Sequence, residues 1–370
     1  MIKFAKNVYN KAGILIELSR GSWSLNQLAD IATTVSNKNK RGETHEIENP
    51  QRVAEVPRGL EADMESHNSN FTPVLDTDGK FIYNASVYNS HHYCPFKNFT
   101  EKLEGYKRSF PVQDDDIYLL NYPKSGTHWT WEILMMLTRG SAAFRPEHKH
   151  EMMLETEFDS SVQKGEGRRI INAHYLYNDM PADILNNNRA KFIQVHRNPA
   201  DVAVSFYHHG KKAVGGLALA YNWTDYIEKL FWDEAKMINS SWSNYTRDWW
   251  THCSGNSNYL PVFYEELKEN PVTTIEKITE FLEIKPKGGL IEQIVSQTSI
   301  EKMKEGKREG ERIRLTHFTP NYSMYRKGVV GDWRNHFTKE QHERFMNHYN
   351  QELRNHPELH QRFLKYLRLS

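Results

Sequence analysis

The residue types best suited to binding an anion lie together in one short loop, Lys124-Ser125-Gly126-Thr127-His128. Residues 117–122 before it form a strand-type run, which Pro123 ends because proline cannot donate to a β-ladder. The apolar residues between positions 129 and 137 recur with the spacing of a helix that packs on a sheet. The loop is therefore expected at a helix N-terminus, where unpaired N–H groups and the helix dipole favour an anion.

Each residue of this loop has a chemical use. Gly126 lets the backbone approach a ligand closely, and Lys124 adds a positive charge. Ser125 and Thr127 add hydroxyl groups, and the neighbouring Trp129 adds a flat face on which a nucleobase can stack. The loop thus predicts a site for a phosphate and a base.

This loop differs from the standard P-loop, GxxxxGK[ST], because its lysine precedes its only glycine. The spacing argues against a kinase or ATPase that binds phosphate through a P-loop. An ordinary strand-to-helix turn with an exposed lysine is the simpler alternative, and the motifs further along the chain decide against it.

The second stretch begins with a strand-type run over residues 191–196 and continues, after the turn Asn198-Pro199, into a predicted helix over residues 201–207. Arg197 then emerges at the carboxyl end of a strand, which is where open α/β sheets bind ligands. Its guanidinium suits a phosphate, and Ser205 could reach the same group from the helix. Taken alone, such an arginine could equally form a surface ion pair.

The third stretch combines two adjacent cations, Arg326 and Lys327, with two glycines, Gly328 and Gly331. Its lack of hydrophobic periodicity indicates a loop that cradles an anion, followed by a helix start at Asp332-Trp333. A solvated charged turn is the alternative, which the spacing of the glycines makes less natural.

Together the three stretches resemble the cytosolic sulfotransferases, which use 3′-phosphoadenosine 5′-phosphosulfate (PAPS) and release 3′-phosphoadenosine 5′-phosphate (PAP). The resemblance covers roughly residues 80–350 and implies that the first loop cradles the 5′-phosphosulfate while Trp129 stacks the adenine. It places the 3′-phosphate on the second and third stretches. The donor-site residues that it implies are Lys124, Ser125, Gly126, Thr127, His128, Trp129, Arg197, Ser205, Tyr264, Thr298, Ser299, Met303, Arg326, Lys327 and Gly328.

The resemblance also implies the catalytic groups, with His174 as general base and Lys124 stabilising the leaving nucleotide, and no metal. From its type alone, His174 would be taken as a structural histidine. The chain departs from the family's pattern at two places, and the second of them, beside His174, is the only support for the alternative of a nucleotide-binding member with little or no turnover. His128 stands where a second threonine is common, and Asn172-Ala173 stands where Lys-Thr is frequent, which removes a second cation near the sulfuryl group.

From residue 115 onward, strand-type runs over residues 117–122, 191–196 and 260–264 alternate with helical runs such as residues 224–239 and 274–282. We therefore expect a single α/β domain over residues 71–370 with a central, mainly parallel sheet flanked by helices. Residues 1–70 are expected to be a partly disordered extension, with an amphipathic helix near residues 5–19 and a polar stretch at residues 36–49. A docking arm or plain extension is favoured over an organelle-targeting helix.

The amino-acid composition limits the kinds of partner that we expect the protein to bind. A net charge of +1 and a pI near 7.8 argue against an extended nucleic-acid surface, and the absence of an 18-residue apolar run argues against a membrane span. Only two cysteines suit a reducing, cytoplasmic location. The expected partner is a small, apolar hydroxyl or amine acceptor, because Phe, Tyr, Trp and Met are plentiful, notably at residues 152–154 and 205–207. Packing in the core would explain these side chains equally well. The family's dimer motif is only partly followed, with Lys339 at its valine position, so a monomer or weak homodimer is expected.

Overall fold

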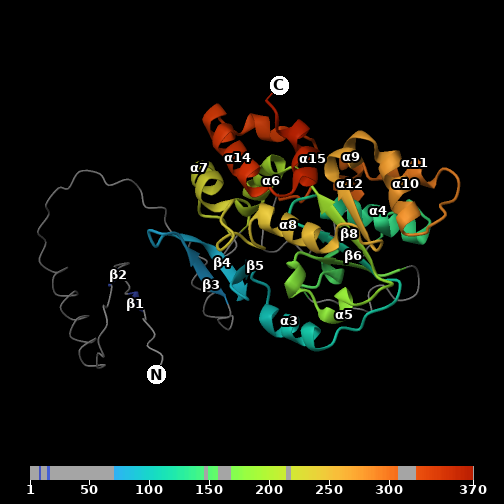
Figure 1. The fold of residues 1–370 in the computed structure, drawn as a ribbon, viewed down its shortest axis with the longest axis horizontal. Helices are drawn as coiled ribbons and strands as arrows, with labels where there is room; N and C mark the ends of the chain where they lie inside the picture. The colour runs from blue at the N-terminus through green and yellow to red at the C-terminus, as the bar shows by residue number, and fades with distance from the viewer. Residues whose placement is uncertain are drawn as a thin grey trace, which may run out of the picture. The chain divides into compact units, whose positions relative to one another are not determined.

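The computed structural model describes residues 71–145, 149–156, 168–213, 218–306 and 322–369, together with two short strands near the N-terminus (Figure 1). The chain divides into two units, residues 1–56 and 57–370. In the first unit, β1 (Val8–Tyr9) pairs antiparallel with β2 (Leu15–Ile16) inside the span predicted to be a helix. The rest of that span, and the polar stretch at residues 36–49, lie outside the described residues.

The second unit is built on a sheet of four parallel strands in the order β7-β6-β8-β9. Three of them fall where strands were predicted, and β7 was not predicted as a strand. The bounds are β6 Ile117–Asn121, β7 Ile170–Ala173, β8 Lys191–His196 and β9 Tyr259–Phe263. The carboxyl ends of all four strands lie at one edge, because every pairing is parallel.

Both faces of this sheet are buried. Ile117 and Leu119 pack into a core with α4, α10 and α11, whereas Tyr118 and Leu120 face a larger core with α6, α8, α14 and α15 (Figure 1). This split follows from the alternation of side chains along a strand. The predicted fold class, an α/β domain with a parallel sheet between helices, is confirmed. The bounds are α4 Thr127–Arg139, α6 Pro199–Gly210, α8 Trp242–Cys253, α10 Pro271–Phe281, α11 Leu290–Gln297, α14 Lys339–Glu352 and α15 Pro357–Leu367.

A separate antiparallel sheet, which was not predicted from the sequence, packs into the larger core. It contains β3 (Thr72–Leu75), β4 (Phe81–Tyr88) and β5 (His91–Tyr93), with Val74, Ile82 and Tyr83 buried. The shorter elements are α3 Phe99–Arg108, η1 Lys149–Met152, η2 Tyr177–Asp179, α5 Ala182–Leu185, α9 Tyr264–Glu269, α12 Ile300–Gly306 and η5 Asp332–Asn335. Among the described residues, no helix has the length and apolar composition needed to cross a bilayer.

The prediction of one helical segment over residues 224–239 is wrong. A short α7 (Trp223–Asp225) leads into a π-helical turn, η4 (Tyr226–Leu230), and turns follow. There the carboxylate of Asp233 accepts the backbone N–H groups of Ala235 and Lys236, each at 3.0 Å. Such local side-chain bonds compete with helical hydrogen bonds, which apolar spacing does not reveal.

A buried ion pair ties β6 to β7 at the edge opposite the site. Arg169 donates to both carboxylate oxygens of Asp116, at 2.7 and 2.6 Å, and Tyr118 Oη adds a bond of 3.0 Å. The Asp116 side chain is 0% exposed and that of Arg169 is 5% exposed. The pair therefore fixes two adjacent strands whose other ends carry the site.

We expect Asp116→Ala to lower the free energy of unfolding by about 3–5 kcal/mol, because it leaves a buried guanidinium without its carboxylate. The matched control is Asp114→Ala, which removes the partner of Arg189 from a pair whose side chains are 68% and 74% exposed. That change should cost less than about 1 kcal/mol. Urea unfolding followed by circular dichroism measures both, and equal losses would contradict the prediction.

Candidate active site

A cavity of about 760 Å³ lies at the carboxyl edge of the parallel sheet and is lined by all three sequence motifs. Of the predicted site residues, Ser125 and Ser299 are outside the lining. Those in the lining are Lys124, Gly126, Thr127, His128, Trp129, His174, Arg197, Ser205, Tyr264, Thr298, Met303, Arg326, Lys327 and Gly328. Segments that are far apart in the sequence, from Lys124 to Gly328, thus meet in one cavity.

The first loop has a backbone that suits an anion. It connects β6 to the 13-residue helix α4, which begins without a side-chain cap. Both Lys124, with φ 72°, and Gly126, with φ 114°, adopt left-handed conformations. A Cβ atom on Gly126 would lie 2.8 Å from Cδ2 of Tyr264, so only glycine fits here. The uncapped N–H groups of α4 are consequently available to a bound anion.

The hydroxyl groups of this loop differ in their availability. Thr127 Oγ1 donates to Asn121 Oδ1 at 2.6 Å, so its proton is already used. Ser125 is 1% exposed, and its Oγ has no hydrogen-bond partner among the described atoms. A buried hydroxyl without a partner is costly, and an anion in the loop would satisfy it.

Arg197 is held in the cavity wall rather than in a surface ion pair. Its guanidinium lies 4.3 Å from the ring centroid of Tyr264 and donates to the carbonyl oxygens of Lys124, at 3.0 Å, and Val329, at 3.4 Å. The residue is 8% exposed, and its Nε has no partner among the described atoms. Arg197 thus joins the first motif to the third and retains a donor.

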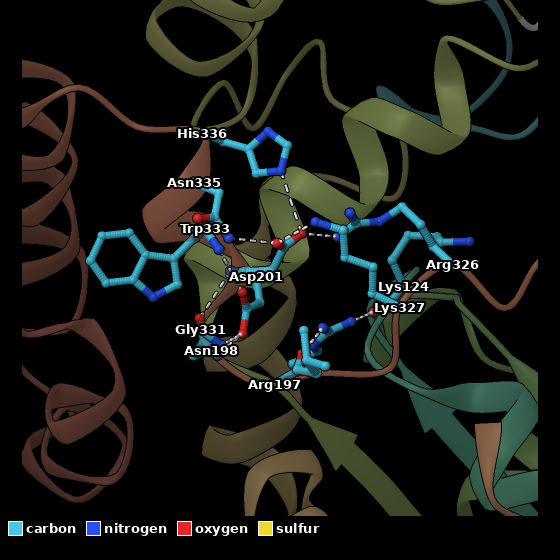
Figure 2. A network of polar contacts seen from close by, with 12 residues as sticks. Lys124, Arg197, Asn198, Asp201, Arg326, Lys327, Gly331, Trp333, Asn335 and His336 are labelled. Atoms are coloured by element: carbon cyan, nitrogen blue, oxygen red, sulfur yellow. Dashed lines mark hydrogen bonds and ion pairs between the residues drawn. The ribbon is translucent and has the colours of Figure 1, made fainter. Parts of the chain in front are cut away.

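The carboxylate of Asp201 fixes the third motif on the second (Figure 2). It accepts the backbone N–H groups of Gly331, at 2.6 Å, and Trp333, at 3.0 Å, and the side-chain amide of Asn198, at 3.0 Å. Asn198 in turn donates twice to Glu265 Oε1, both at 2.8 Å. The position of the glycine-containing loop therefore depends on the first turn of α6.

The cations of the third motif share one carboxylate. Arg326 and Lys327 both lie 2.7 Å from oxygens of Asp332, and His336 approaches to 3.4 Å. Burial would raise the pKa of Asp332, but hydrogen bonds from Lys327, Asn335 and Arg326 outweigh it and hold that pKa well below its usual range. Because two cations face one carboxylate, this side of the cavity keeps a positive charge.

Trp129, which the resemblance assigns to the adenine, packs against another predicted donor-site residue. Trp129 meets Tyr264 edge to face, with ring centroids 5.5 Å apart, and Lys268 lies 5.2 Å above the Trp129 ring. Thr298 lines the cavity, although its hydroxyl donates to Ile294 O at 2.8 Å. Ser299 accepts the N–H of Lys302 at 3.3 Å instead of facing the cavity.

His174 follows β7 and presents one free nitrogen lone pair. Its Nδ1 lies 2.7 Å from the carbonyl oxygen of Asn121, which can only accept, so Nδ1 carries the proton and Nε2 is the basic atom. Burial, followed by the charges of Lys149 and Lys124, lowers the pKa of His174 to about 3. The imidazole is therefore neutral and able to take a proton at neutral pH.

Several residues of the cavity were missed from the sequence. Lys149 in η1 and His209 in α6 both line it, and Lys124 Nζ lies 3.4 Å from His209 Nδ1 and 3.8 Å from Met324 Sδ. His209 directly follows the second motif, so its position in the sequence could have indicated that it belongs to the cavity. Lys149 belongs to no motif, and nothing in its neighbours marks it as a cavity residue.

Residues 114–357 match the family model of the sulfotransferase domain. Amine sulfotransferase of the rabbit Oryctolagus cuniculus is 30% identical over 292 residues, which cover 76% of this chain and 94% of that protein. Sulfotransferase 1A1 of the mouse Mus musculus is 32% identical over 265 residues, which cover 68% of this chain and 89% of that protein. The crystal structure of mouse sulfotransferase SULT7A1 complexed with PAP superposes with a TM-score of 0.63 at 28% identity, covering 76% of this chain and 98% of that chain.

The match extends over most of the second unit and includes each of the three motifs that line the cavity. Two relatives at or above 30% identity align along most of their own length. The chain therefore belongs to the sulfotransferase domain family, and it is a PAPS-dependent sulfotransferase, as its motifs predict.

Proposed function

We propose that this cavity binds PAPS and an apolar small molecule together, and that the acceptor is a hydroxyl or an amine. The observation that carries the proposal is that two separate features suited to binding an anion line one cavity. One is the uncapped start of α4, and the other is the positively charged cluster of Arg197, Arg326 and Lys327. A donor with phosphates at both its 5′ and 3′ positions needs both sites.

The described residues suit each part of this donor. The loop at residues 124–128 would hold the 5′-phosphosulfate, and the buried Ser125 hydroxyl would gain a partner there. The unpartnered Nε of Arg197 would serve the 3′-phosphate together with Ser205 and the 326–328 loop. The exposed part of Trp129 would stack the base, which contributes about 1–3 kcal/mol in other sites.

The proposed reaction needs two of this chain's groups. As the acceptor oxygen or nitrogen bonds to sulfur, its proton passes to His174 Nε2, and the bond between sulfur and the bridging oxygen of the nucleotide breaks. Lys124 stabilises the negative charge left on that oxygen, a preorganised electrostatic role that contributes roughly 3 kcal/mol in comparable sites. Positioning and charge stabilisation dominate, as in phosphoryl transfer.

The apolar residues of the cavity support an apolar acceptor. Phe96, Met153, Phe206 and Ile238 share its lining with His174. The rabbit relative acts, by its name, on amines, and we propose that this chain accepts amines as well as hydroxyl compounds.

We further infer a cytoplasmic protein, monomeric or weakly dimeric, without nucleic-acid or membrane partners.

The donor assignment is tested by calorimetric titration with PAP and, in parallel, ATP. We expect PAP to bind tightly and ATP weakly, and Arg197→Ala to reduce PAP affinity by about 10–100-fold, because charge-assisted hydrogen bonds are worth roughly 1.5–3 kcal/mol. Arg189→Ala, at a 74% exposed side chain, is the control and should leave PAP affinity unchanged. Equal binding of ATP would overturn the assignment.

The loop geometry is tested by Gly126→Ala. We expect PAP affinity to fall by roughly 100-fold, about 2.7 kcal/mol, because the new Cβ meets the Tyr264 ring at 2.8 Å and the loop must shift. Gly140→Ala is matched to it, since Gly140 also has a left-handed conformation, with φ 64°, but an added Cβ there would contact nothing within 4 Å. That variant should lose stability and keep its PAP affinity. Similar PAP affinities in both variants would refute the close approach.

The base is tested by His174→Ala. We expect kcat to fall by about 10²–10⁴-fold with PAP affinity retained. His196→Gln is the control, because burial lowers the pKa of His196 to about 3 as well, yet His196 lies outside the cavity lining. Since His174 stays unprotonated well below neutral pH, kcat of the wild type should not decline between pH 7 and pH 5. Full activity of the His174 variant would place the base elsewhere.

A further inference from the structure

The position before His174 carries no cation in this chain. Asn172 stands on β7, where the sequence pattern of the family frequently has lysine, and it is 0% exposed. Its side-chain amide donates to the carbonyl oxygens of Lys149, at 2.9 Å, and Met152, at 3.4 Å. Its Oδ1 accepts from Lys149 Nζ at 3.4 Å. Asn172 therefore holds the η1 segment against β7 and positions the Lys149 ammonium.

Lys149 is a buried cation in the wall of the cavity. It is 3% exposed and lines the cavity together with Lys124, His174 and His209. Its charge acts on both histidines, because it contributes to the lowered pKa values of His174 and His209. The lysine thus lies on the side of the cavity that holds the base.

The ammonium has hydrogen-bonding capacity left for a ligand. An ammonium has three donors, and the long bond to Asn172 uses one of them. Among the described residues no carboxylate lies within 4.0 Å of Nζ, although the buried Glu155 is near enough to raise the pKa of Lys149. Burial lowers that pKa to about 8, so the side chain still carries its charge at neutral pH. A buried charge without a full set of partners is stabilised by an anion.

We propose that Lys149 is the second cation of sulfuryl transfer, placing its ammonium against the sulfuryl oxygens from the side of the cavity that holds His174. It replaces, from a different segment of the chain, the lysine that position 172 lacks. It keeps its proton throughout and acts by charge alone, while the acceptor proton passes to His174. This inference rests on the proposed use of PAPS.

The test compares two ligands that differ only in the sulfuryl group, PAPS and PAP, by calorimetry without acceptor. In Lys149→Met we expect PAPS affinity to fall about tenfold while PAP affinity changes less than about threefold, and kcat to fall by about 10²–10³-fold. Lys268→Met is the matched control, because Lys268 lines the same cavity beside Trp129 and should affect both ligands equally. In Lys149→Met/Asn172→Lys, where the charge returns from the neighbouring strand, we expect the PAPS preference and part of kcat to recover.

The outcomes separate this inference from the function on which it rests. Failure of the wild type to bind PAP would refute the donor site itself. PAP binding with an unchanged PAPS preference and unchanged kcat in Lys149→Met would overturn the role of Lys149 alone. A second uncharged variant, Lys149→Gln, distinguishes the loss of the charge from a folding defect that is specific to Lys149→Met. Equal loss of PAP and PAPS binding in both uncharged variants would make Lys149 a structural residue and also overturn the proposal.

Discussion

The carboxylate of Asp201 is the contact on which the donor site depends. It lies in the first turn of α6, directly after the strand that delivers Arg197, and it accepts the N–H groups of Gly331 and Trp333 from a loop 130 residues further along the chain. Asn198 and Glu265 extend the same network to α9. The loop at residues 326–331 has no regular hydrogen-bonding ladder of its own, so these bonds decide where its cations stand. Two motifs that are separate in sequence thereby line one cavity.

Burial sets the protonation states of His174 and Lys149 in the cavity lining. Removal from water opposes charge on any group, and it lowers the pKa values of both His174 and Lys149. The effect leaves the imidazole neutral and ready to accept a proton, while the lysine, which starts from a much higher value, stays charged at neutral pH. The same burial thus produces a base and a cation side by side, and the carbonyl of Asn121 selects which imidazole nitrogen is basic.

Most of the fold and much of the site could be predicted from residue patterns, because the signals are local. The phosphate loop, the strand that leads to Arg197 and the glycine-containing loop each carry their chemistry within a few consecutive residues. The antiparallel sheet of β3, β4 and β5 and the break-up of residues 224–239 were missed, since they depend on pairing partners and on side-chain bonds to the backbone. The absence of a cation at position 172 was visible in the sequence, but the position of Lys149 in the cavity lining was not.

The sequence by itself determined the family and the parallel α/β architecture, and it predicted most of the motif residues that line the cavity, because motif spacing and hydrophobic alternation are properties of short segments. Only the tertiary structure decided which groups face one another. The Thr127 hydroxyl is bonded to Asn121, the Ser125 hydroxyl is buried without a hydrogen-bond partner among the described atoms, and Lys149, from a segment without a motif, lines the same cavity as His174. These features follow from contacts between distant segments and from the burial that those contacts create. Neither can be predicted from the order of residues within a short segment.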